Sequence, residues 1–473
     1  MAVKLISREN KHRGFRWFLL LSLPILLGAG DKAYDPTTLV YPAFLHTMGI
    51  RKATKTHLAI YTKNKVKVHD PQGISVVRLK SWDRPNDPND DDEVTGYGVN
   101  SGENLIVYNT SMTALGFYGL NEKGDRALKN PRGVAANEIG DVYVADTGNH
   151  RIVRFKNPTR SLTFVKGIGG LGAAPGFFNA PEGVAMDSRG RVYVSDTGNH
   201  RIQVLRADSV LDFWFGKPGE KDGELRQPSG IAVIDRGQLW SYYKDEFLVV
   251  IDLNYTRVQK FTLDGKFQKA VRLSEVGFPS GQLAYLAIDY YSNVWVTDFA
   301  NHCVHKFDHD LNYLTTFGRR GTGDKEFFEP RGIAIYQRFG QVFVAEKESA
   351  QYFWVGTDVF NFEASWRPTL GVIQLNFFLT EPSYLTLSAT LPGSQNPVDV
   401  FAKKQYFSGS QKVYLNANIE GGPLEDLEAQ EGSFNNDGKT FAKGKYVFKL
   451  KVEPTYSSYK YFFKEVNSEV SIK

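Results

Sequence analysis

Short apolar runs recur along most of the chain, and turn residues separate them. Three of them, Val142–Val144, Val192–Val194 and Val294–Val296, are apolar on both faces of an extended strand. A strand with one wet face would instead alternate apolar and polar residues. Strands without that alternation fit sheets that are covered on both sides. The pattern therefore predicts an all-β fold in which small sheets are sandwiched between neighbouring sheets.

The segment around the first of these runs returns almost unchanged. VYVADTGNHRI from Val142 recurs as VYVSDTGNHRI from Val192, an offset of 50 residues. Weaker copies begin at Val294 (VWVTDFANHCV), Val342 (VFVAEKESAQY), Leu248 (LVVIDLNYTRV) and Leu105 (LIVYNTSMTAL). Repeats of this length are typical of one supersecondary unit that is repeated around a ring or along a solenoid.

These segments resemble the NHL repeat, named for its Asn-His-Leu signature, with Arg in the place of Leu. The resemblance implies a ring-shaped β-propeller. A second signature is a Pro-x-Gly turn before an apolar strand, where Pro fixes one dihedral and Gly is conformationally permissive. In the fifth unit Tyr285 replaces the glycine. The unit starts predict six blades: Pro71, Pro131, Pro181, Pro228, Leu283 and Pro330.

A ring of blades must close, because an exposed sheet edge invites aggregation. The segment His57–Thr62 lies just before the first Pro-x-Gly turn, where the pattern expects a fourth strand. We predict that this strand completes the last blade, so that the propeller spans residues 57–362.

The repeat stops after Trp366, and alternating segments with frequent turns follow, among them Val372–Thr380 and Tyr384–Ala389. This spacing predicts an antiparallel β-sandwich over residues 367–473. The order of its segments looks like the small Ig-like domain of flagellar hook-cap type found at the C-termini of many secreted bacterial proteins. That resemblance implies an accessory or attachment domain.

The N-terminus has the features of a secretory signal peptide. A cationic stretch from Lys4 to Arg16 precedes the apolar run Trp17–Leu27 and the small residues Gly28–Gly30. The run is too short to span a bilayer comfortably. We predict a signal peptide over residues 1–30, a linker over 31–56 and a secreted, periplasmic or cell-surface protein. An uncleaved N-terminal anchor is the alternative.

Charge and cysteine content narrow the class of protein. The formal net charge is +5, of which residues 1–30 carry +4, so the mature chain is close to neutral. A general basic footprint for nucleic acid is absent. The single cysteine, Cys303, excludes intramolecular disulfides, and it takes the Arg position of its repeat as a packed residue. We expect a monomer of bacterial type, with no nucleic-acid partner and no stable membrane insertion.

The DTGNHR turns combine Asp, His and Arg, but their repetition favours a structural role, since a catalytic group is needed only once. We expect Asp146 and Asp196 to accept backbone N–H groups of their own turns, and Gly148 and Gly198 to take positive-φ positions. A metal site needs several imidazoles at one point. The histidines of this repeat, His150, His200 and His302, belong to different units.

The residue between Pro and Gly is a better candidate for recognition. In the usual propeller layout these positions ring one mouth of the central channel, and here they vary while their flanks repeat. Arg132 can pair with Glu182, and Arg331 lies in the unit beside Gln72. The six positions are Gln72, Arg132, Glu182, Ser229, Ala284 and Arg331. Solvated side chains without a ligand are the alternative.

Two long insertions lie between first and second strands, in the first and fourth units, and should project from the opposite face. The insertion of the first unit, within Ser75–Asn109, carries Asp90, Asp91, Asp92 and Glu93. Oxygen ligands in a flexible loop suit Ca²⁺, although their spacing matches no standard loop and a solvated acidic loop is the simpler interpretation. We predict no other cofactor.

Propellers host binding, lyase and hydrolase activities alike, so the fold does not give the function. The leading hypothesis is an exported, non-enzymatic binding or scaffold protein that recognises a protein, peptide or glycan through the propeller faces. The alternative is an enzyme resembling the peptidylglycine amidating lyase or lactonase propellers, with metal ligands in the channel. Ubiquitin-ligase and RNA-binding NHL proteins are disfavoured, because cysteine-rich modules are missing and the mature charge is near neutral.

Overall fold

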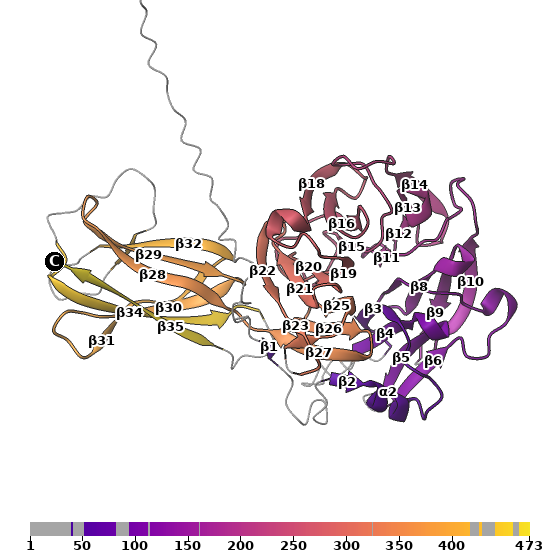
Figure 1. Ribbon diagram of the computed structural model, residues 1–473, viewed down its shortest axis with the longest axis horizontal. Coiled ribbons are helices and arrows are strands. Elements are labelled where there is room, and N and C mark those ends of the chain that lie inside the picture. Colours follow the sequence, from indigo (N-terminus) through magenta and orange to yellow (C-terminus); the bar gives the residue numbers. More distant parts are fainter. Residues whose placement is uncertain are drawn as a thin grey trace, which may run out of the picture. The chain divides into compact units, whose positions relative to one another are not determined.

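The computed structural model describes residues 39–40, 52–81, 94–111, 114–159, 161–323, 325–416, 425–427, 440–456 and 463–473. The described chain is all-β and consists mainly of four-stranded antiparallel sheets, as expected for a propeller (Figure 1). No helix within these ranges is long and apolar enough to cross a membrane. The predicted signal peptide and most of the predicted linker lie outside the described residues.

Five sheets follow one another along the chain, and the strands of each pair in sequence order. Sheet 1 contains β3 (Pro71–Arg78), β4 (Val94–Asn100), β5 (Leu105–Ser111) and β6 (Ala114–Tyr118). Sheet 2 contains β7 (Val134–Ala136), β8 (Asp141–Asp146), β9 (Arg151–Lys156) and β10 (Thr163–Gly169). Sheet 3 contains β11 (Val184–Met186), β12 (Val192–Asp196), β13 (Arg201–Leu205) and β14 (Leu211–Phe215). Sheet 4 contains β15 (Ile231–Ile234), β16 (Phe247–Asp252), β17 (Arg257–Phe261) and β18 (Phe267–Arg272). Sheet 5 contains β19 (Leu283–Ile288), β20 (Val294–Asp298), β21 (Cys303–Phe307) and β22 (Tyr313–Phe317).

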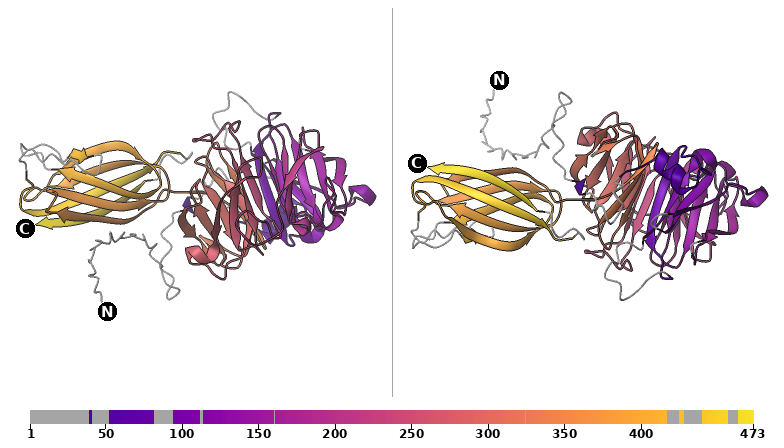
Figure 2. Two further views of the ribbon diagram at one scale, coloured as in Figure 1. Left: turned by 90° about the horizontal axis from the view of Figure 1, so that it is seen from above. Right: turned by 90° about the horizontal axis from the view of Figure 1, so that it is seen from below.

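A further sheet, sheet 6, contains β25 (Pro330–Tyr336), β26 (Gln341–Glu346) and β27 (Ser349–Val355), with β1 (Leu39–Val40) and β2 (Lys52–Thr54) paired to β27. The first strands contact one another in a closed cycle that runs β3, β7, β11, β15, β19, β25 and back to β3. Figure 1 shows inner strands such as β15 and β25 towards the middle of this cycle and β14 and β18 at its periphery. Figure 2 shows the sheets side by side around it.

The second strands are enclosed on both faces, which confirms the interpretation of the apolar runs. Val142, Tyr143 and Val144 are at most 1% exposed. All residues of β8 and β16 are buried. Each sheet buries these strands against its two neighbours, so that apolar clusters form between successive sheets.

The prediction of which segment closes the last sheet was wrong. His57–Thr62 does not form a strand; Lys55–Tyr61 is the helix α2, and the backbone N–H of Thr54 donates to His57 Nδ1 (3.2 Å) at its start. A side chain that accepts this N–H stabilises a helix start, and the sequence interpretation overlooked it. The pairing with β27 comes instead from β1 and β2, which lie earlier in the chain.

Lys52 of β2 gives this pairing an electrostatic anchor. Its Nζ lies 3.0 Å from Glu346 Oε2 and donates to the carbonyl of Glu326 (3.2 Å). The Glu346 side chain is fully buried, and burial raises its pKa while the Lys52 charge opposes that rise. The N-terminal strand thus supplies the cation that a buried carboxylate of sheet 6 needs.

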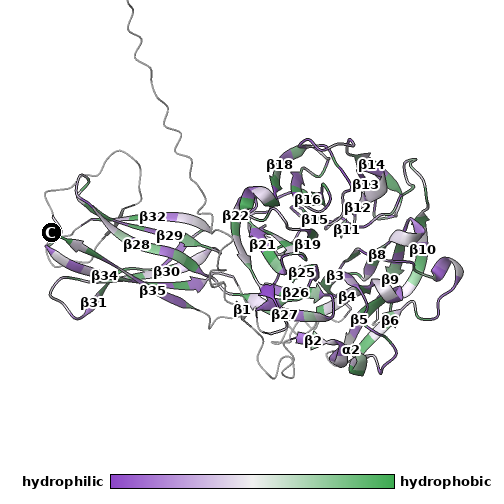
Figure 3. Cartoon of the chain, viewed as in Figure 1, coloured by the Kyte–Doolittle hydropathy of each residue, from purple (hydrophilic) through white to green (hydrophobic). Residues whose placement is uncertain are grey.

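The C-terminal part contains two further four-stranded antiparallel sheets. One contains β28 (Val359–Arg367), β29 (Val372–Leu379), β32 (Gly409–Asn416) and β33 (Glu425–Leu427). The other contains β31 (Pro397–Tyr406), β30 (Ser383–Thr390), β34 (Gly444–Pro454) and β35 (Lys464–Ile472). Both contribute to one apolar core, and β30 and β34 alternate buried and more exposed residues. Figure 3 shows hydrophobic and hydrophilic segments along the strands of these sheets. Because β28 belongs here, the predicted boundary after residue 362 is too late.

One weak repeat copy was matched to the wrong strand. The segment from Leu105 is the third strand of sheet 1, β5, and not the second strand. A short 3-10 turn, Ser101–Glu103, precedes it, so Asn100 occupies the position of Asp146. Because this unit has Asn where most of the other units have Asp, the sequence pattern does not reveal the correct alignment of this copy with the repeat. The insertion still lies between the first and second strands, in residues 79–93, most of which are not described.

Candidate functional site

The turns with the DTGNHR sequence connect neighbouring sheets. Each joins the second and third strands through a short 3-10 turn, Thr147–Asn149 or Thr197–Asn199. The hydroxyl of Thr147 donates to the carbonyl of Pro181 in the next unit (2.6 Å). His150 Nδ1 accepts the backbone N–H of Ala180, directly before that proline (3.0 Å). Every turn thus fixes the start of the next unit, which explains the repetition.

The predicted positive-φ glycines were wrong. His150 and His200, with φ of 55° and 56°, take the left-handed conformation. The glycine is needed for close approach, because a Cβ on Gly148 would lie 2.8 Å from the carbonyl oxygen of Lys129. The aspartates were expected to accept backbone N–H groups of their own turns, but the backbone donors lie in the preceding loop. Asp146 Oδ1 accepts the N–H of Lys129 and Asp196 Oδ1 that of Asn179 (both 2.7 Å).

We expect His200→Ala to reduce the free energy of unfolding by about 0.5–1.5 kcal/mol, since it removes one hydrogen bond to the next unit, from the N–H of Gln227 (3.0 Å). Ligand affinity should stay unchanged. Chemical denaturation and titration calorimetry check both. A variant that melts like the wild type but no longer binds ligand would show that the turn is a binding element.

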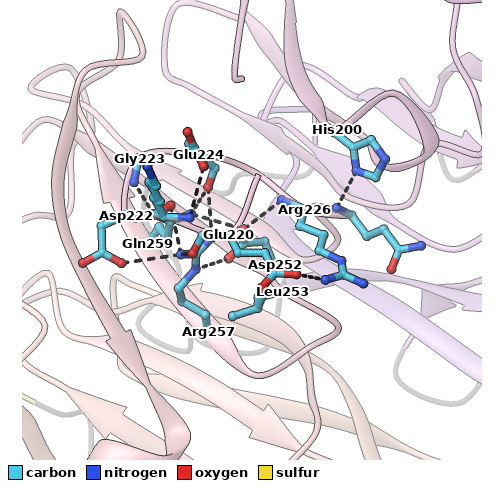
Figure 4. A network of polar contacts seen from close by, with 12 residues as sticks. His200, Glu220, Asp222, Gly223, Glu224, Arg226, Asp252, Leu253, Arg257 and Gln259 are labelled. Atoms are coloured by element: carbon cyan, nitrogen blue, oxygen red, sulfur yellow. Dashed lines mark hydrogen bonds and ion pairs between the residues drawn. The ribbon is translucent and has the colours of Figure 1, made fainter. Parts of the chain in front are cut away.

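Each of three buried aspartates at the end of a second strand bonds the arginine five residues later, in the pairs Asp146–Arg151, Asp196–Arg201 and Asp252–Arg257. The third pair is the most enclosed, with both side chains fully buried and Arg257 Nη2 2.7 Å from Asp252 Oδ2. Arg257 also donates to the carbonyls of Glu220 and Glu224 (2.7 and 2.9 Å; Figure 4). These ion pairs hold the loop before each unit in place.

The residues between Pro and Gly meet at one cavity of about 200 Å³, the channel mouth. All six predicted positions line it, together with three aromatic side chains that the sequence analysis did not assign to the site. The predicted residues are Gln72, Arg132, Glu182, Ser229, Ala284 and Arg331, and the added ones are Tyr255, Tyr285 and Phe299. The substitution of Tyr285 for the repeat glycine was the available signal for the second of these.

Arg132 and Glu182 form the expected pair, with Nη1 3.6 Å from Oε1. Burial raises the pKa of Glu182, and the Arg132 charge and a hydrogen bond from Tyr255 (3.2 Å to Oε2) oppose the rise. Burial also raises the pKa of Tyr255 to about 12, so that its hydroxyl remains a donor. One cation of the mouth is therefore partly compensated by a carboxylate.

Arg331 is held beside an aromatic ring. Its guanidinium carbon lies 4.5 Å from the centre of the Phe299 ring, and Nη2 donates to Glu329 Oε2 (3.3 Å). The Nε atoms of Arg331 and Arg132 are both buried without a hydrogen-bond partner in the described chain. A buried donor without an acceptor is costly. The side chains of Arg132 and Arg331 are 30% and 20% exposed, so a turn of the guanidinium group towards the mouth would let an anionic ligand accept from Nε.

Tyr285 reaches across the mouth. Its hydroxyl donates to Gln72 Oε1 in sheet 1 (3.3 Å), and its ring lies so near Gly73 that a Cβ there would be 3.2 Å from Cε1. A second cavity of about 640 Å³ begins beyond this level and is lined by later residues of the same inner strands, such as Ile74 and Leu286. Tyr285 lines the mouth cavity, whereas the next residue, Leu286, lines the second cavity.

Another hollow is a groove of about 790 Å³, which is lined by Arg189, Arg191, Arg236, Tyr243 and Lys244. Much of its positive charge is compensated, since Arg189 Nε lies 3.5 Å from Asp235 and Nη2 lies 4.0 Å from Glu246. The groove also has one buried donor without an acceptor, Arg191 Nη2. We favour the smaller mouth because all six positions between Pro and Gly converge on it.

The predicted calcium ligands, Asp90, Asp91, Asp92 and Glu93, lie outside the described residues. Cys303 is buried, as expected from its repeat position. Within the described ranges, one group of His, Cys, Asp or Glu side chains is close enough to share an ion: Asp298, Cys303 and His305. It does not line the channel cavities.

Two stretches of the sequence, residues 128–155 and 178–205, match the NHL repeat. The chain carries NHL repeats. The matched stretches contain the DTGNHR turns and the second and third strands of sheets 2 and 3. A comparison with curated proteins finds no match.

Several solved structures are similar to part of this chain. Virginiamycin B lyase from Staphylococcus aureus is 13% identical over 56% of this chain and 82% of its own, with a TM-score of 0.39. A gluconolactonase from Xanthomonas campestris is 12% identical over 69% and 99%, with a TM-score of 0.40. A protein of unknown function from Bacteroides thetaiotaomicron is 17% identical over 61% and 70%, with a TM-score of 0.44. At such values, these similarities carry no argument about the activity of this NHL-repeat chain.

Proposed function

We propose that this chain is an exported, non-enzymatic binding protein in which a six-bladed NHL propeller is followed by an Ig-like sandwich. The closed cycle of inner strands supports six blades, with β1 and β2 closing the last. The shared core of the two C-terminal sheets supports the sandwich. The ligand is a protein, peptide or glycan that places an anionic group in the channel mouth.

The observation that carries this proposal is the pair of buried Nε donors, on Arg132 and Arg331, at one cavity. A guanidinium recognises a carboxylate through two parallel N–H bonds, one from Nε. The cavity of about 200 Å³ is small for a whole ligand. It suits one carboxylate-bearing unit at the end of a larger molecule, such as a peptide C-terminus or a single uronate.

The lining also favours binding over the lyase or lactonase alternative. That alternative needs metal ligands in the channel. Carboxylates such as Glu138, Asp141 and Asp187 line the second cavity. Among the described residues, however, the group of His, Cys, Asp and Glu side chains close enough to share an ion lines neither cavity. The mouth offers hydrogen-bond donors and aromatic faces, which orient a ligand without providing an activated water or nucleophile.

A screen of matched ligands tests the proposal. We expect the full-length chain to bind peptides with a free C-terminal carboxylate, or glycans that contain uronate, at least about tenfold more tightly than the amidated or neutral counterparts, since one charge-assisted pair contributes about 1.5–3 kcal/mol. Calorimetry measures the ratio. Equal affinities for each acid and its neutral partner would contradict recognition of an anion.

A further inference from the structure

Several sheets of this propeller bury a carboxylate at the end of the second strand. A basic side chain lies beside each of these carboxylates and compensates its charge. Sheets 2, 3 and 4 each pair an Asp with an Arg five residues later. In sheet 6 the carboxylate is Glu346, and Lys52 supplies the charge. In sheet 5 the carboxylate is Asp298, and Cys303 occupies the arginine position. Among the ion pairs of the described residues, Asp298 has only the imidazole of His305.

His305 is also a departure from the repeat. It stands two residues after the arginine position, where sheets 3 and 4 have Gln203 and Gln259, and both of those amides donate to the buried aspartate. Sheet 5 has therefore replaced an arginine and a glutamine by a cysteine and a histidine around the same carboxylate. Both replacements introduce a metal-ligating atom in place of a hydrogen-bond donor.

The three side chains converge on one point. His305 Nε2 lies 3.1 Å from Asp298 Oδ2 and 3.9 Å from Cys303 Sγ, and the three candidate ligand atoms all lie within 4.8 Å of one another. Tetrahedral zinc with usual bond lengths separates such ligand atoms by about 3.3–3.6 Å, so only small shifts are required. Asp298 and His305 are fully buried, and Cys303 is 2% exposed.

The arrangement does not suit a cysteine nucleophile. In a Cys-His-Asp relay the carboxylate holds the imidazole nitrogen opposite to the one that faces the sulfur. Here Asp298 and Cys303 both face Nε2 of His305. Convergence on one nitrogen is the geometry of ligands that share an ion.

Hydrogen bonds from neighbouring groups hold these side chains in place. Metal-ligating side chains in proteins are commonly oriented by hydrogen bonds of this kind. Nδ1 of His305 lies 2.7 Å from the hydroxyl of Thr316, so a proton on Nδ1 leaves Nε2 available. Asp298 Oδ1 accepts backbone N–H groups of Gln282 and Asn301 (both 3.0 Å). Oδ2 accepts the side-chain amide of Asn301 (2.7 Å) and faces the other two ligands.

We propose that Asp298, Cys303 and His305 bind one Zn²⁺ ion, which replaces the arginine cation of the other sheets. Oδ2, Sγ and Nε2 supply one oxygen, one sulfur and one nitrogen, which are three of the four ligands of tetrahedral zinc, and a water molecule completes the set. Binding releases the thiol proton of Cys303, since the thiolate is the ligand. Because the site is buried, the ion enters during folding and has a structural role.

The full-length chain, produced in medium supplemented with zinc or with cobalt, provides the test. We expect close to one equivalent of metal per chain. The cobalt form should show thiolate-to-metal charge transfer and the visible bands of tetrahedral cobalt. Metal content no higher than that of a Cys303→Ser, His305→Gln double variant, with no thiolate charge transfer, would overturn the proposal.

Two further variants separate ligation from folding. Cys303→Arg with His305→Gln restores the side chains of sheets 3 and 4, so it should fold without metal and its melting temperature should not respond to a chelator present during refolding. The wild type refolded with the chelator should melt at a lower temperature. His309→Gln, which alters a half-exposed His–Asp contact (3.1 Å), should keep the metal. Loss of metal in this variant, or a wild type indifferent to the chelator, would contradict the site.

Discussion

Replacing Lys52 by alanine should lower the free energy of unfolding by about 3–5 kcal/mol, the usual cost of leaving one partner of a buried ion pair uncompensated. Lys52 is 14% exposed, while Glu346 is fully enclosed and also accepts the backbone N–H of Phe328 (2.7 Å). Without the ammonium group, that carboxylate must protonate or draw water into the edge of sheet 6, and both loosen the closure by β2.

Lys55→Ala is the matched control. Lys55 also pairs with a glutamate of sheet 6, Glu348, but both side chains are about half exposed (51% and 50%). Exposed pairs contribute about 0–1 kcal/mol, so this variant should unfold close to the wild type. Chemical denaturation followed by tryptophan fluorescence compares the two. Equal losses of stability would show that closure by the N-terminal strand does not depend on the buried pair.

The strands of the propeller could be predicted because the same sequence pattern recurs in several units. Apolar runs such as Val142–Val144 and the recurring turns specify local structure by short-range physics. Closure could not be predicted with the same certainty, since it depends on which distant segment reaches β27. His57–Thr62 has a strand-like pattern, but the contact between Thr54 and His57 favours a helix, and the strand that pairs with β27, β2, ends at Thr54, before this segment.

The candidate site was predictable where it follows the repeat and unpredictable where it departs from it. The positions between Pro and Gly, such as Arg132 and Arg331, converge because every unit begins alike. Tyr255 and Phe299 reach the same cavity from turns after second strands, and no repeat position marks them. The approach of His305 to Asp298 depends on strand register between β20 and β21, which a sequence pattern leaves open.

Removing both guanidinium groups of the mouth, with Arg132→Gln and Arg331→Gln, should make the binding free energy of an acidic ligand less favourable by about 2–4 kcal/mol. This corresponds to a loss of affinity of about 30- to 1000-fold. Each charge-assisted contact contributes about 1.5–3 kcal/mol, and two that hold one ligand overlap in part. The fold should persist, because the side chains of Arg132 and Arg331 are 30% and 20% exposed at the mouth. A control with the same charge change, Arg189→Gln and Arg236→Gln, alters the groove instead and should keep the affinity.

Removing a negative charge from the same cavity, in place of the positive ones, gives a second test. Glu182→Gln keeps an acceptor for Tyr255 and Arg132 but removes the negative charge that repels an anion. We expect this variant to bind the acidic ligand more tightly than the wild type. A general loss of folding would weaken binding in all these variants, so an increase distinguishes recognition at the mouth from structural damage.

The most direct test of the account is the affinity of the strongest acidic ligand from the screen for the Arg132→Gln, Arg331→Gln chain, measured by calorimetry beside the wild type and the groove control. The account predicts a loss of at least about 30-fold in the mouth variant alone. Undiminished affinity in a folded mouth variant would contradict it and would place the ligand elsewhere, with the groove around Arg189 and Tyr243 as the next candidate.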